Sequence, residues 1–397
     1  MPLLSKTDFQ VMKKATHIVS GIKAEWVRRR FRWHVLKLAV KQFGFSMQAF
    51  QVLNHLNKLR QQVHGSKVIK KWVRVNGRFH FFLYAPSFNS RQLDQMLEDE
   101  MQRAMQQHLN KRMLRFAFFA ITKKCPMHCM HCFEWDNLNQ REVISYDKIR
   151  QTVVKLINAG IVQLHLSGGE PMVRINDIVK LASEFSDKVE IYVLTSGFNA
   201  TPENIKLLKQ AGVTGLVISL DDYRKQQHDK FRGFDGAFGL AVNAAQYARQ
   251  MDMIVCLSVC CTREFTSPEN LYNYLELAHR LDVSFVQLLE PKAVGHYAGR
   301  DVKLSEEQTR LLRTFYEDVN FNSRYKNYPI VIYHGYYQPV IGCFSAGNRA
   351  LYVDTNAEVM NCPFCKTSSG NLLHDDVHNV INTARANGCT AYFKPVF

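Results

Sequence analysis

Between residues 115 and 325 the chain alternates strand-like and helical segments, and this alternation constrains the fold more than any other feature. The strand-like runs are short and rich in β-branched and aromatic residues, and the segments between them have helical periodicity. Six β-then-α units predict an α/β fold with a parallel sheet and right-handed crossovers. The expected strands are 115–121, 161–166, 190–195, 215–220, 253–259 and 283–289, and the expected helices are 146–159, 175–186, 202–211, 237–250, 269–281 and 305–318.

Periodicity alone leaves open whether six units wind a partial barrel or form an open sheet. In both arrangements ligand sites gather at the carboxyl ends of the strands. We therefore expect the chemistry of this chain where the strand-like runs end.

Two further regions flank the repeat. Residues 8–62 have helical periodicity, Asn76-Gly77 between two β-rich runs predicts a hairpin, and a polar helix follows at 90–110. After the repeat, residues 349–360 predict a second hairpin that turns at Asn356-Ala357. The predicted domains are a basic helical and hairpin region (1–112), a core (113–325) and a small cysteine-rich α+β domain (326–397).

The net charge of +16 is concentrated at the N-terminus. Residues 1–80 hold 17 Lys and Arg and two acids, which gives +15 and leaves +1 for the other 317 residues. In the expected helix, Trp26, Val27, Phe31 and Leu38 predict one apolar stripe beside the basic residues. Such a helix suits a membrane interface, an acidic peptide or nucleic acid phosphates, or it packs on the core with its charge solvated. Nucleic acid is the least favoured partner, because no nucleic-acid-binding motif accompanies the charge.

No apolar run approaches the roughly 20 residues of a membrane-spanning helix, and no secretory signal is present. We therefore expect a cytoplasmic protein, with contact to the inner face of the membrane through residues 1–80 as one interpretation. The ten cysteines are too sparse for a disulfide scaffold. Clustered thiols in a reducing compartment indicate metal or redox chemistry instead.

Cys125, Cys129 and Cys132 lie within eight residues, just past the first expected strand. Three thiolates can hold three irons of a [4Fe–4S] cluster and leave the fourth iron open to a ligand with an amine and a carboxylate. The alternatives are a zinc site completed from elsewhere and cysteines of the core.

This C-x3-C-x2-C spacing resembles the radical S-adenosylmethionine (radical SAM) superfamily, whose fold is a partial (β/α)6 barrel. Three more segments resemble it at successive strand ends: 167–171 (SGGEP), 195–197 (TSG), and 219–222 (SLDD) with 228–233 (HDKFRG). The resemblance covers about 115–325. It implies cofactor-binding roles for Gly168, Gly169, Glu170, Ser196, Ser219, Asp221 and Arg232.

The resemblance also implies individual roles. Glu170 is expected near the methionine ammonium group, Ser219 and Arg232 at the methionine carboxylate, and Asp221 at the ribose or the substrate. Reduction of the cluster by flavodoxin or ferredoxin would cleave S-adenosylmethionine and yield a 5′-deoxyadenosyl radical that abstracts a substrate hydrogen. Asp221 and Glu290 are the only candidates for a catalytic side chain, and capping or ion pairing is an equal interpretation of Glu290.

Cys343, Cys362, Cys365 and Cys389 can close a metal site completely. Residues 342–371 resemble the SPASM and twitch extensions of radical SAM enzymes, which implies one auxiliary [4Fe–4S] cluster. The cysteine set for two clusters is absent, and Ala357 stands where the family has a turn glycine. The alternatives are a structural zinc site and Cys389 as a bystander.

Cys256, Cys260 and Cys261 lie on or after the fifth expected strand and are expected in the core. The hypothesis is thus a radical SAM enzyme that modifies a peptide or protein, as the cysteine-rich tail favours. A membrane-associated small molecule or lipid is the alternative substrate, favoured by the N-terminus. A non-catalytic iron–sulfur or zinc protein is the remaining alternative.

Overall fold

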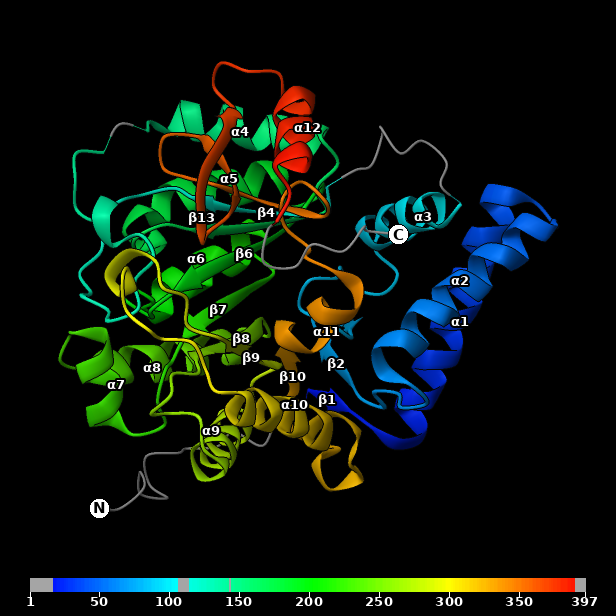
Figure 1. Ribbon diagram of the computed structural model, residues 1–397, viewed down its shortest axis with the longest axis horizontal. Coiled ribbons are helices and arrows are strands. Elements are labelled where there is room, and N and C mark those ends of the chain that lie inside the picture. Colours follow the sequence, from blue (N-terminus) through cyan, green and yellow to red (C-terminus); the bar gives the residue numbers. More distant parts are fainter. Residues whose placement is uncertain (1–16, 106–113, 143, 390–397) are drawn as a thin grey trace.

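The computed structural model describes residues 17–105, 114–142 and 144–389 (Figure 1). Part of the expected N-terminal helix (8–16), the end of the polar helix and the domain boundary at 112 lie outside these residues. The limits at 112 and 325 stay predictions.

A curved sheet of ten strands forms the centre of the described structure, in the order β10-β9-β8-β7-β6-β5-β4-β11-β12-β13. All six expected strands are present and pair in parallel with their chain neighbours. The strand order ends at β10 on one edge and β13 on the other, so the arrangement is an open, partial barrel. Its parallel strands are β4 (Phe116–Ala120), β5 (Gln163–Ser167), β6 (Glu190–Thr195), β7 (Gly215–Ser219), β8 (Ile254–Cys260), β9 (Phe285–Leu289) and β10 (Ile330–Tyr333).

Strand β10 was not predicted; it pairs in parallel with β9 and extends the sheet past residue 325. Its four apolar residues follow Pro329 directly and are too few for a periodicity to emerge. The tail also joins the barrel, which was not predicted: β11 (Ala350–Val353) pairs in parallel with β4. Antiparallel β12 (Glu358–Cys362) and β13 (Cys365–Asn371) follow, and the turn at Asn356-Ala357 between β11 and β12 is confirmed.

Helices cover the outer face of the sheet, as Figure 1 shows. Four of them start at a Ser or Thr whose side chain accepts a backbone N–H of the first turn, at Ser145, Thr201, Ser267 and Ser305. The helices are α4 (Tyr146–Asn158), α5 (Ile175–Phe185), α6 (Pro202–Ala211), α7 (Lys225–Arg232), α8 (Ala237–Gln250), α9 (Pro268–Arg280) and α10 (Glu306–Phe321).

Alternation along the strands divides the core into two layers. Leu164 and Leu166 of β5 pack outward against the helices, in a cluster with Ile191 and Val193 of β6. Tyr192 lies on the inner face, in a second cluster with Phe116 and Phe285. The barrel interior is therefore filled by side chains at this level.

The N-terminal region packs at the barrel as a small unit. β1 (Ile18–Val19), β2 (Trp72–Val75) and β3 (Arg78–His80) form an antiparallel sheet, which confirms the hairpin at Asn76-Gly77. Val73 and Val75 join the inner cluster of the barrel. Helices α1 (Gly21–Phe43), α2 (Met47–His64) and α3 (Arg91–Ala104) pack together beside this sheet.

The apolar stripe predicted for α1 is only partly correct. Val27 and Leu38 are buried against α2, α3 and the small sheet, as the packing alternative requires. Trp26 instead lies on the opposite side with 53% of its surface exposed, and Trp33 is 64% exposed. The two faces lie about half a turn apart around the helix, and composition alone did not distinguish them.

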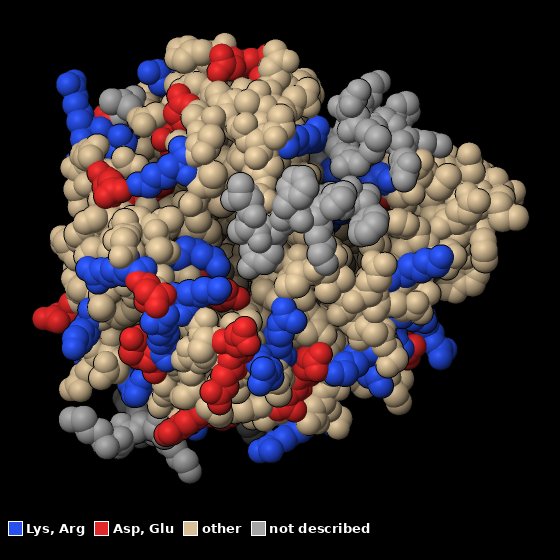
Figure 2. Space-filling view, in the orientation of Figure 1, with Lys and Arg blue, Asp and Glu red and all other residues tan. Residues whose placement is uncertain are grey.

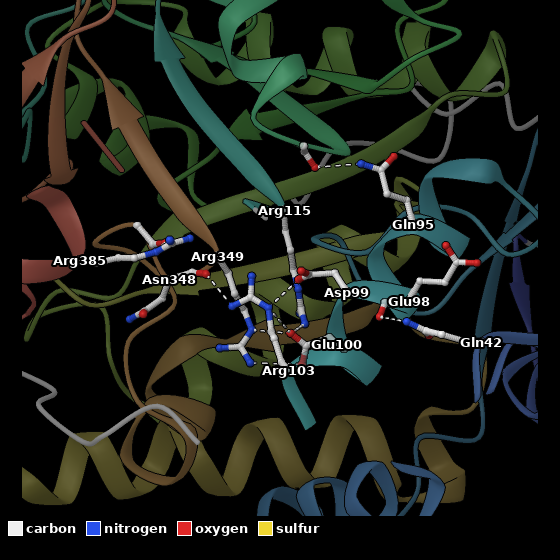
Figure 3. A network of polar contacts seen from close by, with 12 residues as sticks. Gln42, Gln95, Glu98, Asp99, Glu100, Arg103, Arg115, Asn348, Arg349 and Arg385 are labelled. Atoms are coloured by element: carbon white, nitrogen blue, oxygen red, sulfur yellow. Dashed lines mark hydrogen bonds and ion pairs between the residues drawn. The ribbon is translucent and has the colours of Figure 1, made fainter. Parts of the chain in front are cut away.

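A buried charge network joins three parts of the chain that are far apart in sequence (Figure 3). Glu100 of α3 pairs with Arg115, which precedes β4, and with Arg349, which precedes β11, at 3.3 Å. Burial would raise the pKa of Glu100, but Arg115, Arg349 and Arg103 outweigh burial and hold it well below its usual value of 4.5. The network fastens the N-terminal helices and the tail to the first barrel strand.

Candidate functional site

The loop that carries Cys125, Cys129 and Cys132 begins where β4 ends, at the carboxyl edge of the sheet. Cys129 is buried, and Cys125 and Cys132 are partly buried. The backbone N–H of Cys125 donates to Asn139 Oδ1, whose amide in turn donates to Cys125 O, both at 3.0 Å. These two hydrogen bonds therefore hold the start of the loop against Asn139, which lies in the segment that follows the loop.

Helix α7 holds the middle of the same loop. The backbone N–H of His128 donates to Arg232 O at 2.9 Å, and that of Met130 donates to Phe231 O at 3.0 Å. The structure therefore brings the expected cysteine loop and the 228–233 motif together.

The Ser167–Pro171 turn packs against the cysteine loop from the other side. Gly169 N donates to Thr122 O and Glu170 N donates to Lys124 O, each at 2.7 Å. A Cβ atom at Gly168 or Gly169 would overlap those two carbonyl oxygens. We expected these glycines to let the backbone approach a ligand; the close approach in the structure is to the cysteine loop itself. Their contact with a cofactor stays a prediction.

Glu170 links the second and third strand ends. Its carboxylate accepts hydrogen bonds from Thr195 Oγ1 at 2.7 Å, from Ser196 N at 2.8 Å and Oγ at 2.6 Å, and from Met172 N at 3.0 Å. Burial raises the pKa of Glu170, and these hydrogen bonds oppose that rise. Ser196, expected at the cofactor, donates two hydrogen bonds to Glu170. These bonds connect the chain just after β5 with the chain just after β6, and we call this pair of residues the Glu170 brace.

Arg232 and Asp221 form a buried ion pair of 2.5 Å beside the cysteine loop. Arg232 Nη1 also donates to Cys129 Sγ at 3.5 Å. Burial would raise the pKa of Asp221, but Arg232, together with His131, His228 and the backbone N–H of Cys260, outweighs burial and lowers it. A guanidinium at this place stabilises negative charge on the Cys129 sulfur, as a thiolate ligand requires.

Ser219 ends β7, two residues before Asp221 in the chain, and is partly buried. His228 opens the 228–233 motif, where a polar sequence predicts a surface or helix-entry residue. It is fully buried in α7, and its Nδ1 accepts the backbone N–H of Asp221 at 3.0 Å. The contact between His228 and Asp221 forms only in the folded chain, so no motif in the sequence marks it.

The segment after β9 forms a clamp that the sequence analysis missed. His296 N donates to Cys132 O at 2.9 Å, and His296 Nδ1 donates to Cys129 O at 3.0 Å. The His296 ring stacks on Trp135 with centroids 3.8 Å apart. Gly295 has a φ of 57°, and a Cβ there would overlap Cys132 O, so glycine is required at this contact.

Glu290 directly follows β9. Its carboxylate accepts the Tyr333 hydroxyl at 2.7 Å and pairs with Lys292 at 3.4 Å. These contacts match the ion-pairing interpretation of Glu290. Cys256, Cys260 and Cys261 are buried, in agreement with their expected place in the core.

The four tail cysteines are neighbours in the structure. Burial, followed by contact with the Cys389 thiol, raises the pKa of Cys343 to about 12, and Cys362 adds to this effect. Burial also raises the pKa of Cys362, with further contributions from Cys365 and Cys389. Cys362 and Cys365 pair across the β12–β13 turn. Four soft donors are the ligand chemistry of an iron–sulfur cluster or zinc, but these thiols are not yet arranged around one metal position.

No group of three or more His, Cys, Asp or Glu side chains in the described ranges is arranged to hold a metal ion. The fit of the first loop to a cluster therefore depends on its donor chemistry: three cysteines and a buried guanidinium beside the central one. Burial raises the pKa of Cys125 and Cys132 to about 12, so both thiols are protonated near neutral pH in the metal-free protein.

Comparison with known families agrees with this geometry. Residues 119–281 match the family model of the Radical SAM superfamily. The chain is 26% identical over 206 residues to an AdoMet-dependent heme synthase of Methanosarcina barkeri (51% of this chain, 58% of that protein). It is 28% identical over 173 residues to a PqqA peptide cyclase of Bradyrhizobium diazoefficiens (42% and 45%). It is 24% identical over 278 residues to AlbA, an antilisterial bacteriocin subtilosin biosynthesis protein of Bacillus subtilis (67% and 59%).

The chain thus spans between 45% and 59% of the length of these curated relatives. Among solved structures, Streptococcus suis SuiB bound to the precursor peptide SuiA aligns with a TM-score of 0.57 at 13% identity, over 76% of this chain and 71% of SuiB. SuiB bound to S-adenosylmethionine aligns with a TM-score of 0.56 at 14% identity, over 76% and 72%. At such identities the structural similarity shows the fold, and the partial barrel is the fold they share.

Proposed function

We propose, from the match of residues 119–281 to the Radical SAM superfamily model, that the chain is a radical SAM enzyme that removes a hydrogen atom from a peptide substrate. A [4Fe–4S] cluster and S-adenosylmethionine, when bound, supply the 5′-deoxyadenosyl radical for that step. The relatives named above are enzymes.

The observation that carries this proposal is the packing around the three-cysteine loop. Cys125, Cys129 and Cys132 are presented at the carboxyl ends of parallel strands, with Arg232 against Cys129. Arg232, Ser219 and Asp221 would hold the cofactor, and the Glu170 brace keeps two neighbouring strand ends in register beside it. The filled barrel interior below this rim excludes water from the reacting groups.

We further propose that the tail cysteines hold one auxiliary [4Fe–4S] cluster and that a flavodoxin or ferredoxin supplies the electrons. The contact between the Cys343 and Cys389 thiols and the pairing of Cys362 with Cys365 support the auxiliary site. Anaerobic reconstitution would then give about eight irons per chain. About four irons would remove the auxiliary cluster, and stoichiometric zinc would make the tail a zinc domain.

The peptide substrate is supported by three of the proteins compared, whose names state a peptide cyclase, a bacteriocin biosynthesis protein and a precursor-peptide complex. The test uses deuterated short peptides encoded beside the gene. Transfer of deuterium into 5′-deoxyadenosine would support a peptide substrate. If only a lipid or small-molecule extract stimulates turnover, the substrate proposal is wrong.

A second candidate is substrate delivery at an anionic membrane, because the N-terminal helices expose apolar side chains beside basic ones. Trp26 and Trp33 lie seven residues apart on the exposed side of α1, and Arg30 stacks over Trp26 at 4.6 Å. In Figure 2 the side of α1 and α2 carries Lys and Arg with few acidic side chains. Tryptophan with arginine favours the interface of anionic lipid. The exposed apolar residues of this region are Ile22, Trp26, Trp33, Phe45, Met47 and Phe50.

Among the described helices, none has the length and apolar character to cross a membrane. Flotation with phosphatidylglycerol vesicles tests peripheral contact, with Trp26→Ala plus Trp33→Ala as the variant. Leu207→Ala, at an apolar residue of α6 that is 44% exposed, is the matched control. Equal flotation of all three proteins would contradict membrane contact through α1.

A further inference from the structure

The four residues after Cys132 touch the cysteine-rich tail at three points. The centroid of the Phe133 ring lies 6.0 Å from the centroid of the Phe364 ring and 5.8 Å from that of the Tyr352 ring. The Tyr352 hydroxyl donates to Glu134. Lys366 pairs with Asp136 at 2.5 Å. We call residues 133–136 the bridge.

The tail side of these contacts is the part that bears its cysteines. Phe364 lies inside the turn between Cys362 and Cys365, and Lys366 follows Cys365 directly. Phe364 is 42% exposed, so few other contacts fix its ring. A metal bound by Cys362 and Cys365 would hold this turn in one conformation, and with it the Phe364 ring.

The other side of the bridge leads to the first cysteine loop. Trp135 stacks on His296 with an angle of 8° between the rings. His296 in turn donates to the backbone carbonyls of Cys129 and Cys132. The bridge is therefore packed between the tail turn and the residues that fix two of the three loop cysteines.

We propose that the bridge makes S-adenosylmethionine binding at the first cysteine loop depend on metal occupancy of the tail, with Phe133 and Phe364 as positioning residues. The inference builds on the proposed function, because it requires metal at both cysteine sets. Metal bound in the tail holds the Phe364 ring in one position. Phe364 then limits the movement of the Phe133 ring, and Phe133 limits the movement of the adjacent Cys132. An empty tail frees the turn, and the loop then samples arrangements that bind the cofactor less well.

A purely structural contact predicts a different outcome. In that case loss of Phe364 lowers the stability of the tail but leaves cofactor affinity at the loop unchanged. The two interpretations therefore separate in a binding measurement, which requires no substrate and no turnover.

The experiment uses the full chain, reconstituted anaerobically, with iron content, the electron paramagnetic resonance spectrum of the reduced protein and the affinity for S-adenosylmethionine by equilibrium dialysis as readouts. The variants are Phe364→Ala, Cys343→Ala with Cys389→Ala, and all three changes together. Lys366→Gln is a second test of the bridge at an exposed ion pair and avoids the risk of misfolding. Leu207→Ala, of similar exposure to Phe364 but distant in the fold on α6, is the control.

We expect Phe364→Ala to keep wild-type iron and to bind S-adenosylmethionine about 2- to 10-fold more weakly, the range of one aromatic contact. Emptying the tail should give a similar loss, and the combination no more than the larger single effect. Unchanged affinity in Phe364→Ala and Lys366→Gln, or effects that multiply in the combination, would overturn the coupling. A wild-type protein with about four irons would instead overturn the auxiliary cluster of the proposed function.

Discussion

The Arg232 guanidinium lies 2.5 Å from the Asp221 carboxylate, and both side chains are more than nine-tenths buried. The resemblance assigned the two residues to different ends of a cofactor. Their pairing means that Asp221 also fixes the guanidinium that contacts Cys129.

Asp221→Asn should leave the Arg232 charge buried without its partner, which costs about 3–5 kcal/mol. Chemical denaturation of the metal-free protein measures this loss. Asp301→Asn is the control, because Asp301 pairs with Arg263 at the surface, where both side chains are exposed, and should cost below about 1 kcal/mol. Equal losses in the two variants would show that the buried pair has no special role.

Lys71 should be the main polar fastening of the N-terminal sheet to the barrel. Its buried Nζ lies 2.9 Å from Val319 O and within 3.3 Å of the carbonyl oxygens of Tyr325, Tyr328 and Pro329. Lys71→Met would remove the donor from this cage and should lower the free energy of unfolding by about 2–4 kcal/mol. Lys67→Met, at an exposed pair with Glu317, should cost below about 1 kcal/mol. A Lys71→Met protein as stable as wild type would contradict this assignment.

Stability should fall in acid because of Glu100. Its pKa in the folded protein is depressed by Arg115, Arg349 and Arg103, in spite of burial. A depressed carboxyl pKa contributes stability that is fully present above the unfolded value of 4.5 and is lost as the pH falls below it. Glu100→Gln should be less stable than wild type at pH 7, and the difference should shrink below pH 4.5. A constant difference across that range, measured by thermal unfolding, would exclude Glu100 as the titrating group.

The sequence predicted the parallel core because local signals determine it. Short β-rich runs, capped helices and glycine turns recur in order, and each strand pairs with its chain neighbour. The order of the motifs also placed the cysteine loop, the Gly168-Gly169 turn and Arg232 on one rim. Their convergence follows from the topology, because the carboxyl ends of parallel strands share an edge.

The contacts that fix the site were not predictable, because their partners are distant in sequence. His296 meets Cys132 across 164 residues, and Phe364 meets Phe133 across 231. Gly295 and His296 carry no motif that marks them as a clamp. Trp26 was misplaced for a related reason, since both faces of α1 carry aromatic residues and only the packing of α2 and α3 shows which face is buried.

The central claim is that the three-cysteine loop supports radical cleavage of S-adenosylmethionine. The most direct measurement is 5′-deoxyadenosine formed by the anaerobically reconstituted protein with dithionite and S-adenosylmethionine. We predict formation by wild type and by Cys261→Ala, whose cysteine is buried in the core, and none above background by Cys129→Ala. Equal amounts from wild type and Cys129→Ala, at equal protein and iron content, would contradict the account.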